Sequence, residues 1–143
     1  MLKMKDFQDF MQGVMHKSYA DLSMVDLQMH LTPKLQEYDL PVKFETDEVK
    51  SGGLFSTSSL PCLVIINSEH KSNYYYIVIV LSKQGAVGVL NFYLTGYSKN
   101  ATKLEFSEGM AKNRIRIPVN QHKIQDEQNY YNILKHALSE SFC

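Results

Sequence analysis

The feature that most constrains this chain is a pair of adjacent apolar runs in its middle. The runs read "YYYIVIVLS" and "AVGVLNFYLT", and only "KQG" separates them. β-Branched and aromatic residues dominate both runs, and a short gap that contains glycine is typical of a β-hairpin. A strand of an antiparallel sheet commonly buries one face and exposes the other, but these runs are apolar at nearly every position. Both faces of this hairpin therefore need cover, which the rest of the chain, a ligand or a second chain can supply.

Burial favours one register of the predicted hairpin. With Gln84 and Gly85 as the two-residue turn, alternate side chains form a wholly apolar face, on which Ile77 lies opposite Phe92. A slip by one residue would bring Asn91 onto that face and divide the apolar set. We therefore predict a main core face that carries Ile77, Ile79, Leu81, Leu90, Phe92 and Leu94.

The second face of the hairpin is mixed, and it carries Tyr74, Tyr76, Val78, Asn91 and Tyr93. Three kinds of cover remain open for it. Helices from the two ends of the chain, or the serine- and glycine-rich segment 50–59, can lie over it. A second copy can cover it in a homodimer, because a large apolar patch usually marks an interface. A small molecule can bind there, with Tyr74, Tyr76, Tyr93 and Asn91 as the binding residues.

The rest of the chain supplies helices at both ends and further strands between them. Apolar residues at three- and four-residue steps predict a helix over 5–16, a second one from Leu22 to near Tyr38, and a C-terminal one over 124–142. Pro33 must interrupt the second helix or open a new turn of it. Strands are expected over 42–49, 60–67, 102–108 and 113–119. We therefore predict one α+β domain, 1–143, in which N-terminal helices and one C-terminal helix flank a mainly antiparallel meander of about five strands.

The charge balance and the distribution of side chains exclude several classes of protein. The chain has 15 Lys and Arg against 15 Asp and Glu, so no overall field favours nucleic acid. We expect no membrane segment and no signal peptide, and hence a cytoplasmic protein, because charges interrupt the N-terminus and no apolar run is long enough. The 5 histidines and 2 cysteines lack the spacing of metal ligands, so we expect neither a metal nor a cofactor.

Two polar groups are candidates for chemistry. Arg114 and Arg116 alternate with isoleucines, and Lys112 precedes them, so one strand face can bind an anion. The alternative is a solvated face whose charges prevent edge-to-edge pairing. His70 follows Glu69, and with Ser56 to Ser59 it would serve an enzyme whose cleft is lined by tyrosines.

These observations favour a non-catalytic binding or interaction module over an enzyme. The alternative is a small-molecule-binding protein or enzyme that uses the cleft of Tyr74, Tyr76 and Tyr93 together with loop groups such as His70. Self-association as a homodimer would use the second sheet face, through which a two-fold axis lets one patch cover itself.

Overall fold

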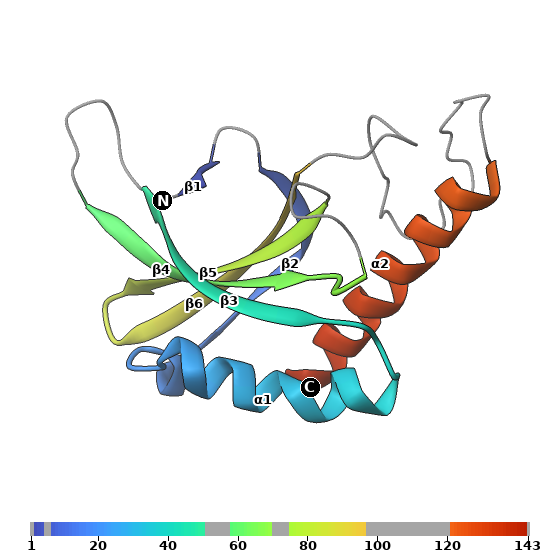
Figure 1. The fold of residues 1–143 in the computed structure, drawn as a ribbon. Helices are drawn as coiled ribbons and strands as arrows, with labels where there is room; N and C mark the ends of the chain where they lie inside the picture. Colours follow the sequence, from blue (N-terminus) through green and yellow to red (C-terminus); the bar gives the residue numbers. More distant parts are fainter. Residues whose placement is uncertain (1, 5–6, 51–57, 70–74, 97–120, 143) are drawn as a thin grey trace.

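The structure is a computed structural model, and it describes residues 2–4, 7–50, 58–69, 75–96 and 121–142. Within these residues the chain forms a six-stranded, mostly antiparallel sheet and two α-helices, which confirms the α+β class (Figure 1). The elements in chain order are β1 (Leu2–Lys3), β2 (Gln8–His16), the 3-10 turn η2 (Lys17–Tyr19), α1 (Met24–Glu37), β3 (Lys43–Lys50), β4 (Ser59–Ile66), β5 (Tyr76–Gln84), β6 (Val87–Thr95) and α2 (Gln121–Ser141).

The order of the strands forces the sheet to curl. The order is β1-β3-β4-β5-β6-β2, so β1 and β2 lie at opposite edges although they follow each other in the chain. In a flat sheet these edges would be about 24 Å apart. The chain from Lys3 to Gln8 reaches about 18 Å when fully extended. The Phe7 amide donates a hydrogen bond of 3.0 Å to the Met4 carbonyl, which holds these two residues close together. The edges must therefore approach each other, and Figure 1 shows the strands bending round between them.

Residues 8–16 form a strand, so the helix predicted over 5–16 is wrong. The strand β2 pairs with β6, and its register shifts between Asp9 and Met11 and again between Met11 and Val14. These irregularities break the simple alternation of side chains. As a result Phe10, Met11 and Val14 all contact the main core, and their three- and four-residue spacing imitates that of an amphipathic helix.

The second predicted helix is present as α1. It begins after Ser23, whose side chain accepts a hydrogen bond of 3.0 Å from the Asp26 amide. The helix runs through Pro33 without a break, whereas we expected an interruption or a new turn there. The predicted strands over 42–49 and 60–67 appear as β3 and β4, and the C-terminal helix appears as α2. The strands predicted over 102–108 and 113–119 lie outside the described residues.

The hairpin of β5 and β6 has the predicted faces but another turn. Its central residues are Gly85 and Ala86, and Ile77 pairs with Leu94 rather than with Phe92. Gly85 has a positive φ of 61°, which glycine adopts without steric cost. The register differs from the predicted one by two residues, which is the period of side chains along a strand. Every paired residue of β5 and β6 therefore keeps its predicted face.

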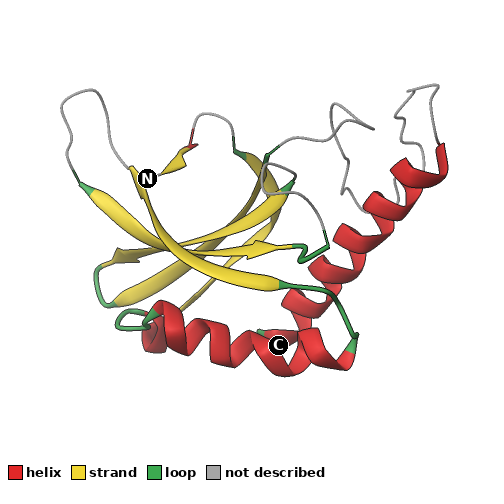
Figure 2. Ribbon diagram, viewed as in Figure 1, coloured by secondary structure: helices red, strands yellow, loops and turns green. Residues whose placement is uncertain are grey.

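The two helices cover the predicted core face of the sheet. Leu27, Leu31 and Leu35 of α1 and Tyr131, Leu134 and Leu138 of α2 are buried there together with the six predicted core residues of the hairpin. Figure 2 shows α1 beneath the sheet, with the C-terminal end of α2 beside it. This cluster is the main core.

The second face of the sheet has a smaller core of its own. Its buried residues are Val49, Cys62, Val64, Val78 and Val80, which come from β3, β4 and β5. Leu2 of β1 and Phe7, which directly precedes β2, pack against this cluster. The Phe7 ring lies 5.3 Å from the ring of Tyr93. Curling of the sheet therefore lets the chain cover much of its own second face.

Replacing Ile77 by alanine tests the main core. Ile77 is fully buried, so the Ile77→Ala variant should lose about 2 to 5 kcal/mol of unfolding free energy through the cavity it leaves. Val25→Ala is the matched control, because Val25 is 62% exposed on α1 and its truncation should change stability by less than about 0.5 kcal/mol. Urea titration of both variants gives these values, and equal midpoints for the two would contradict the assigned core.

Candidate functional site

The tyrosines predicted to line a cleft lie at the rim of the second core. Tyr76 and Tyr93 are half-buried and pack against that core. Burial raises the pKa of both hydroxyls, and nearby carboxylates act in the same direction, so both hydroxyls remain protonated donors at neutral pH. Tyr74 lies outside the described residues. A small-molecule cleft here and a homodimer through this face both stay predictions.

Asn91 of β6 lies at the contact between β6 and β2. A Cβ atom placed on Gly13 would lie 2.6 Å from the Asn91 Oδ1 atom and 2.9 Å from the Leu90 carbonyl oxygen. The close approach of the two strands therefore requires glycine at this position of β2. This contact gives the asparagine a structural role, and its predicted role as a binding residue stays a prediction.

The remaining predicted polar candidates fall mostly in segments that the structure does not describe. Arg114, Arg116, Lys112 and His70 lie outside the described residues, as do Ser56 and Thr57. Their anion-binding and enzymatic roles stay predictions.

A polar cluster that the sequence did not predict joins α1 to α2. The Tyr38 hydroxyl donates to the Glu140 carboxylate, which also lies 3.5 Å from the His136 Nε2 atom and 3.9 Å from the Lys34 Nζ atom. The hydrogen bond raises the pKa of Tyr38 to about 12 and lowers that of Glu140. Tyr38 and Glu140 are 102 residues apart in the chain, so no local sequence pattern predicts their contact. Because the cluster lies on the surface, we interpret it as a contact that aligns the two helices.

Glu127 is a buried carboxyl group on α2. Its residue is 6% exposed, and burial raises its pKa to about 7. The charge of Glu127 contributes to raising the pKa of Tyr131, which lies one turn along the same helix. The Tyr131 hydroxyl donates a hydrogen bond of 2.7 Å to the Tyr75 carbonyl and so ties α2 to the sheet. Near neutral pH this end of α2 therefore holds a carboxyl group that is partly protonated.

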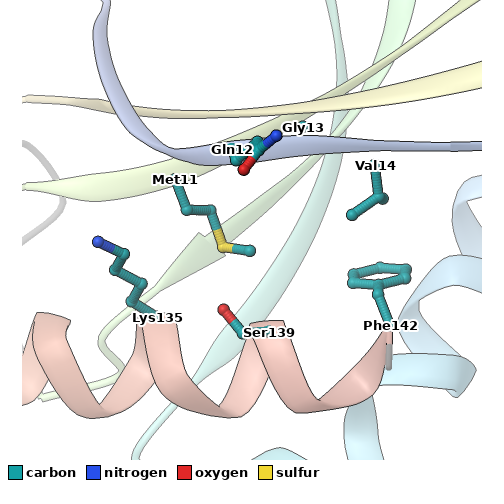
Figure 3. Close-up of a pocket in the computed structure, with 7 residues that line it drawn as sticks. All are labelled: Met11, Gln12, Gly13, Val14, Lys135, Ser139 and Phe142. Atoms are coloured by element: carbon teal, nitrogen blue, oxygen red, sulfur yellow. The ribbon is translucent and has the colours of Figure 1, made fainter.

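A groove lies between β2 and α2, and all of its lining belongs to the described residues. Its volume is about 460 Å³, and its lining residues are Met11, Gln12, Gly13, Val14, Lys135, Ser139 and Phe142. In Figure 3, Met11 and Val14 point from β2 toward the helix, and Lys135 and Ser139 point from the helix toward β2. Neither chain segment was predicted to form a site.

Aromatic packing fixes one end of the groove. Phe142 follows α2, and its ring lies 5.7 Å from the ring of Phe92 in the main core and 5.3 Å from the ring of His30 on α1. The His30 Nε2 atom also lies 2.6 Å from the Ser141 carbonyl oxygen. These contacts hold the C-terminal end of α2 in place, so the groove has a wall that is part of the folded core.

The side chains of the groove suit binding. Three of them, Met11, Val14 and Phe142, are apolar. Gln12, Lys135 and Ser139 add an amide, a cation and a hydroxyl. The lining includes no carboxylate, imidazole or thiol. An apolar surface with a few polar groups that fix orientation is the usual composition of a ligand site.

No protein-family model matches the chain, and neither a curated protein nor a solved structure matches it significantly. No helix in the described part of the chain has the length and apolar character that a membrane crossing requires. Among the same residues, no three His, Cys, Asp or Glu side chains lie together in a way that could hold a metal ion. The expected absence of a metal, a cofactor and a catalytic activity stays a prediction.

The buried carboxyl of Glu127 predicts a specific pH dependence of stability. Between pH 4.5 and about 7 the native state keeps a proton that the unfolded chain has lost. The contribution of Glu127 to the free energy of unfolding is therefore fully present below pH 4.5, and it is lost as the pH rises through about 7. Glu127→Gln should abolish this loss, which amounts to roughly 2 to 3 kcal/mol between pH 5 and pH 8.

Urea unfolding at pH 5 and pH 8 measures this effect. The glutamine variant should be more stable than the original protein at pH 8. Asp126→Asn is the matched control, since Asp126 is the exposed neighbour on the same helix. An identical change of stability with pH in the original protein and in Glu127→Gln would contradict the prediction.

Proposed function

We propose that this chain is a non-catalytic binding module and that the groove between β2 and α2 is its ligand site. The observation that carries this proposal is the composition of the groove: a concavity of about 460 Å³ with both apolar and polar lining residues and without a carboxylate, imidazole or thiol. The volume lies within the range of about 300 to 1,000 Å³ that is usual for ligand sites. The proposal agrees with the binding or interaction role expected from the sequence.

The second face of the sheet supports a ligand site less strongly. Its central residues, including Val78 and Cys62, are fully buried in the second core. Tyr76 and Tyr93 offer only the rim of that core to a ligand or to a second copy. The groove, in contrast, presents side chains from two elements toward a common open space (Figure 3).

A fragment screen tests the groove as a binding site. We expect small amphipathic fragments, observed by NMR with isotope-labelled protein, to shift the signals of Met11, Val14 and Ser139. Ser139→Trp should fill the groove and weaken the binding of these fragments by about tenfold or more, because the indole occupies the space of the ligand. Met29→Trp is the control, since Met29 is 67% exposed on α1 and does not line the groove.

Two outcomes would contradict the proposal. Fragment shifts that gather at Tyr76 and Tyr93 would place the ligand site on the second face of the sheet. Unchanged affinity in Ser139→Trp, with a native spectrum, would show that the groove is not where the fragments bind.

A further inference from the structure

One side chain, Phe142, belongs both to the groove and to the packing of the main core. The residue directly follows α2, and its amide donates a hydrogen bond of 3.2 Å to the Ser139 carbonyl. Its ring lines the groove and is also packed, half-buried, against the main core. In Figure 3 this ring lies beneath Val14 of β2. A molecule that binds in the groove therefore meets an aromatic surface.

Aromatic rings from three elements set the position of Phe142. Its ring centre lies 6.0 Å from that of Tyr19 on η2, 5.3 Å from that of His30 on α1 and 5.7 Å from that of Phe92 on β6. The contacts with Tyr19 and Phe92 are edge-to-face, with angles of 77° and 63° between the rings. Aromatic pairs favour this arrangement because the positive edge of one ring meets the negative face of the other. The fold itself therefore orients the ring that a ligand meets.

Met11 adds a second group that favours aromatic ligands. Its half-buried side chain points from β2 toward α2 (Figure 3). A thioether is polarisable, and its sulfur atom makes favourable contacts with the edges of aromatic rings. Its flexible chain also adjusts to the shape of a bound group. Together with Val14, Met11 and Phe142 give the groove an apolar surface that suits a flat ring.

We propose that the groove binds a small molecule through an aromatic ring, and that Phe142 is the residue that selects this ring. The inference rests on the proposed function of the groove and names its class of ligand. The ligand ring packs between Met11, Val14 and Phe142, where it extends the edge-to-face contact between Phe142 and Phe92. The volume of about 460 Å³ suits a free small molecule that carries one ring and a short polar tail.

The alternative is a groove that accepts any apolar group of suitable size. Burial of apolar area stabilises a phenyl and a cyclohexyl group to a similar degree, because it depends on area alone. Edge-to-face pairing and the thioether contact, in contrast, require a π system. The preference for an aromatic over a saturated ring therefore measures the contribution of Phe142 and Met11 separately from that of apolar area.

A matched pair of ligands tests the proposal. We would titrate the full chain with phenylpropanamide and with cyclohexylpropanamide, which share a polar tail, and follow binding by NMR. The phenyl compound should bind about three- to tenfold more tightly. Phe142→Leu should lower this ratio by about threefold or more, because leucine keeps an apolar wall but lacks the ring. Met11→Leu conserves volume and removes the sulfur, so it should lower the ratio by about twofold or more.

Ile133→Ala is the matched control for these variants. Ile133 is 43% exposed on the same helix and does not line the groove, so its truncation should leave the ratio unchanged. The ratio compares two ligands on one variant, and a loss of stability alone does not alter it. If Phe142→Leu fails to fold, Met11→Leu decides the question, and an unchanged ratio in that variant would overturn the proposal.

The other outcomes separate this proposal from that of the groove itself. Equal affinities of the two compounds for the original protein would overturn the aromatic preference and leave a site for any apolar group. An unchanged ratio in a folded Phe142→Leu variant would overturn the role of Phe142. Tighter binding of a short peptide with a central phenylalanine than of phenylpropanamide would identify a polypeptide ligand and contradict the small molecule. If neither compound nor any fragment binds in the groove, the proposed function fails as well.

Discussion

The short covalent connection between β1 and β2 is the constraint on which the rest of the structure depends. It joins the two opposite edges of a six-stranded sheet with too few residues to span a flat one. The sheet can satisfy it only by curling, with Leu2 and Phe7 brought over the second face. Curling also means that different parts of the chain cover the two faces. The helices cover one, and the sheet with its N-terminal segment covers the other.

Both apolar faces of the central hairpin are covered in this arrangement. The branched side chains Val78 and Val80 contact Val64 and Cys62 inside the curl, while Ile77 and Ile79 face the helices. Burial of the Cys62 thiol raises its pKa to about 11, so it behaves as a small apolar residue of the second core. With both faces of the hairpin covered, the groove that we propose as a ligand site lies between β2, at one edge of the described sheet, and α2.

The sequence predicts the interior of this fold better than its edges or its site. The hairpin faces and α2 follow from strong periodic patterns, and they hold even with the register shifted by two residues. The strand β2 was missed because its bulges give Phe10, Met11 and Val14 a helical spacing. The pairing of β1 with β3 has no local signal, since it depends on two residues. Met11 and Ser139 both line the groove, and only the tertiary structure brings residues so distant in the sequence together.

The most direct test of the curled sheet is a set of NMR distances that involve the N-terminal segment. Nuclear Overhauser contacts between the ring protons of Phe7 and those of Tyr93 should be strong, because the ring centres lie 5.3 Å apart. In the same spectrum, Leu2 should show contacts to Val49, its pairing partner on β3, which lies at the other side of the sheet from β6 and β2. Together these contacts can arise only if the two edges approach each other. Contacts of Phe7 to Tyr93 with none between Leu2 and Val49, or the reverse, would contradict the curling of the sheet.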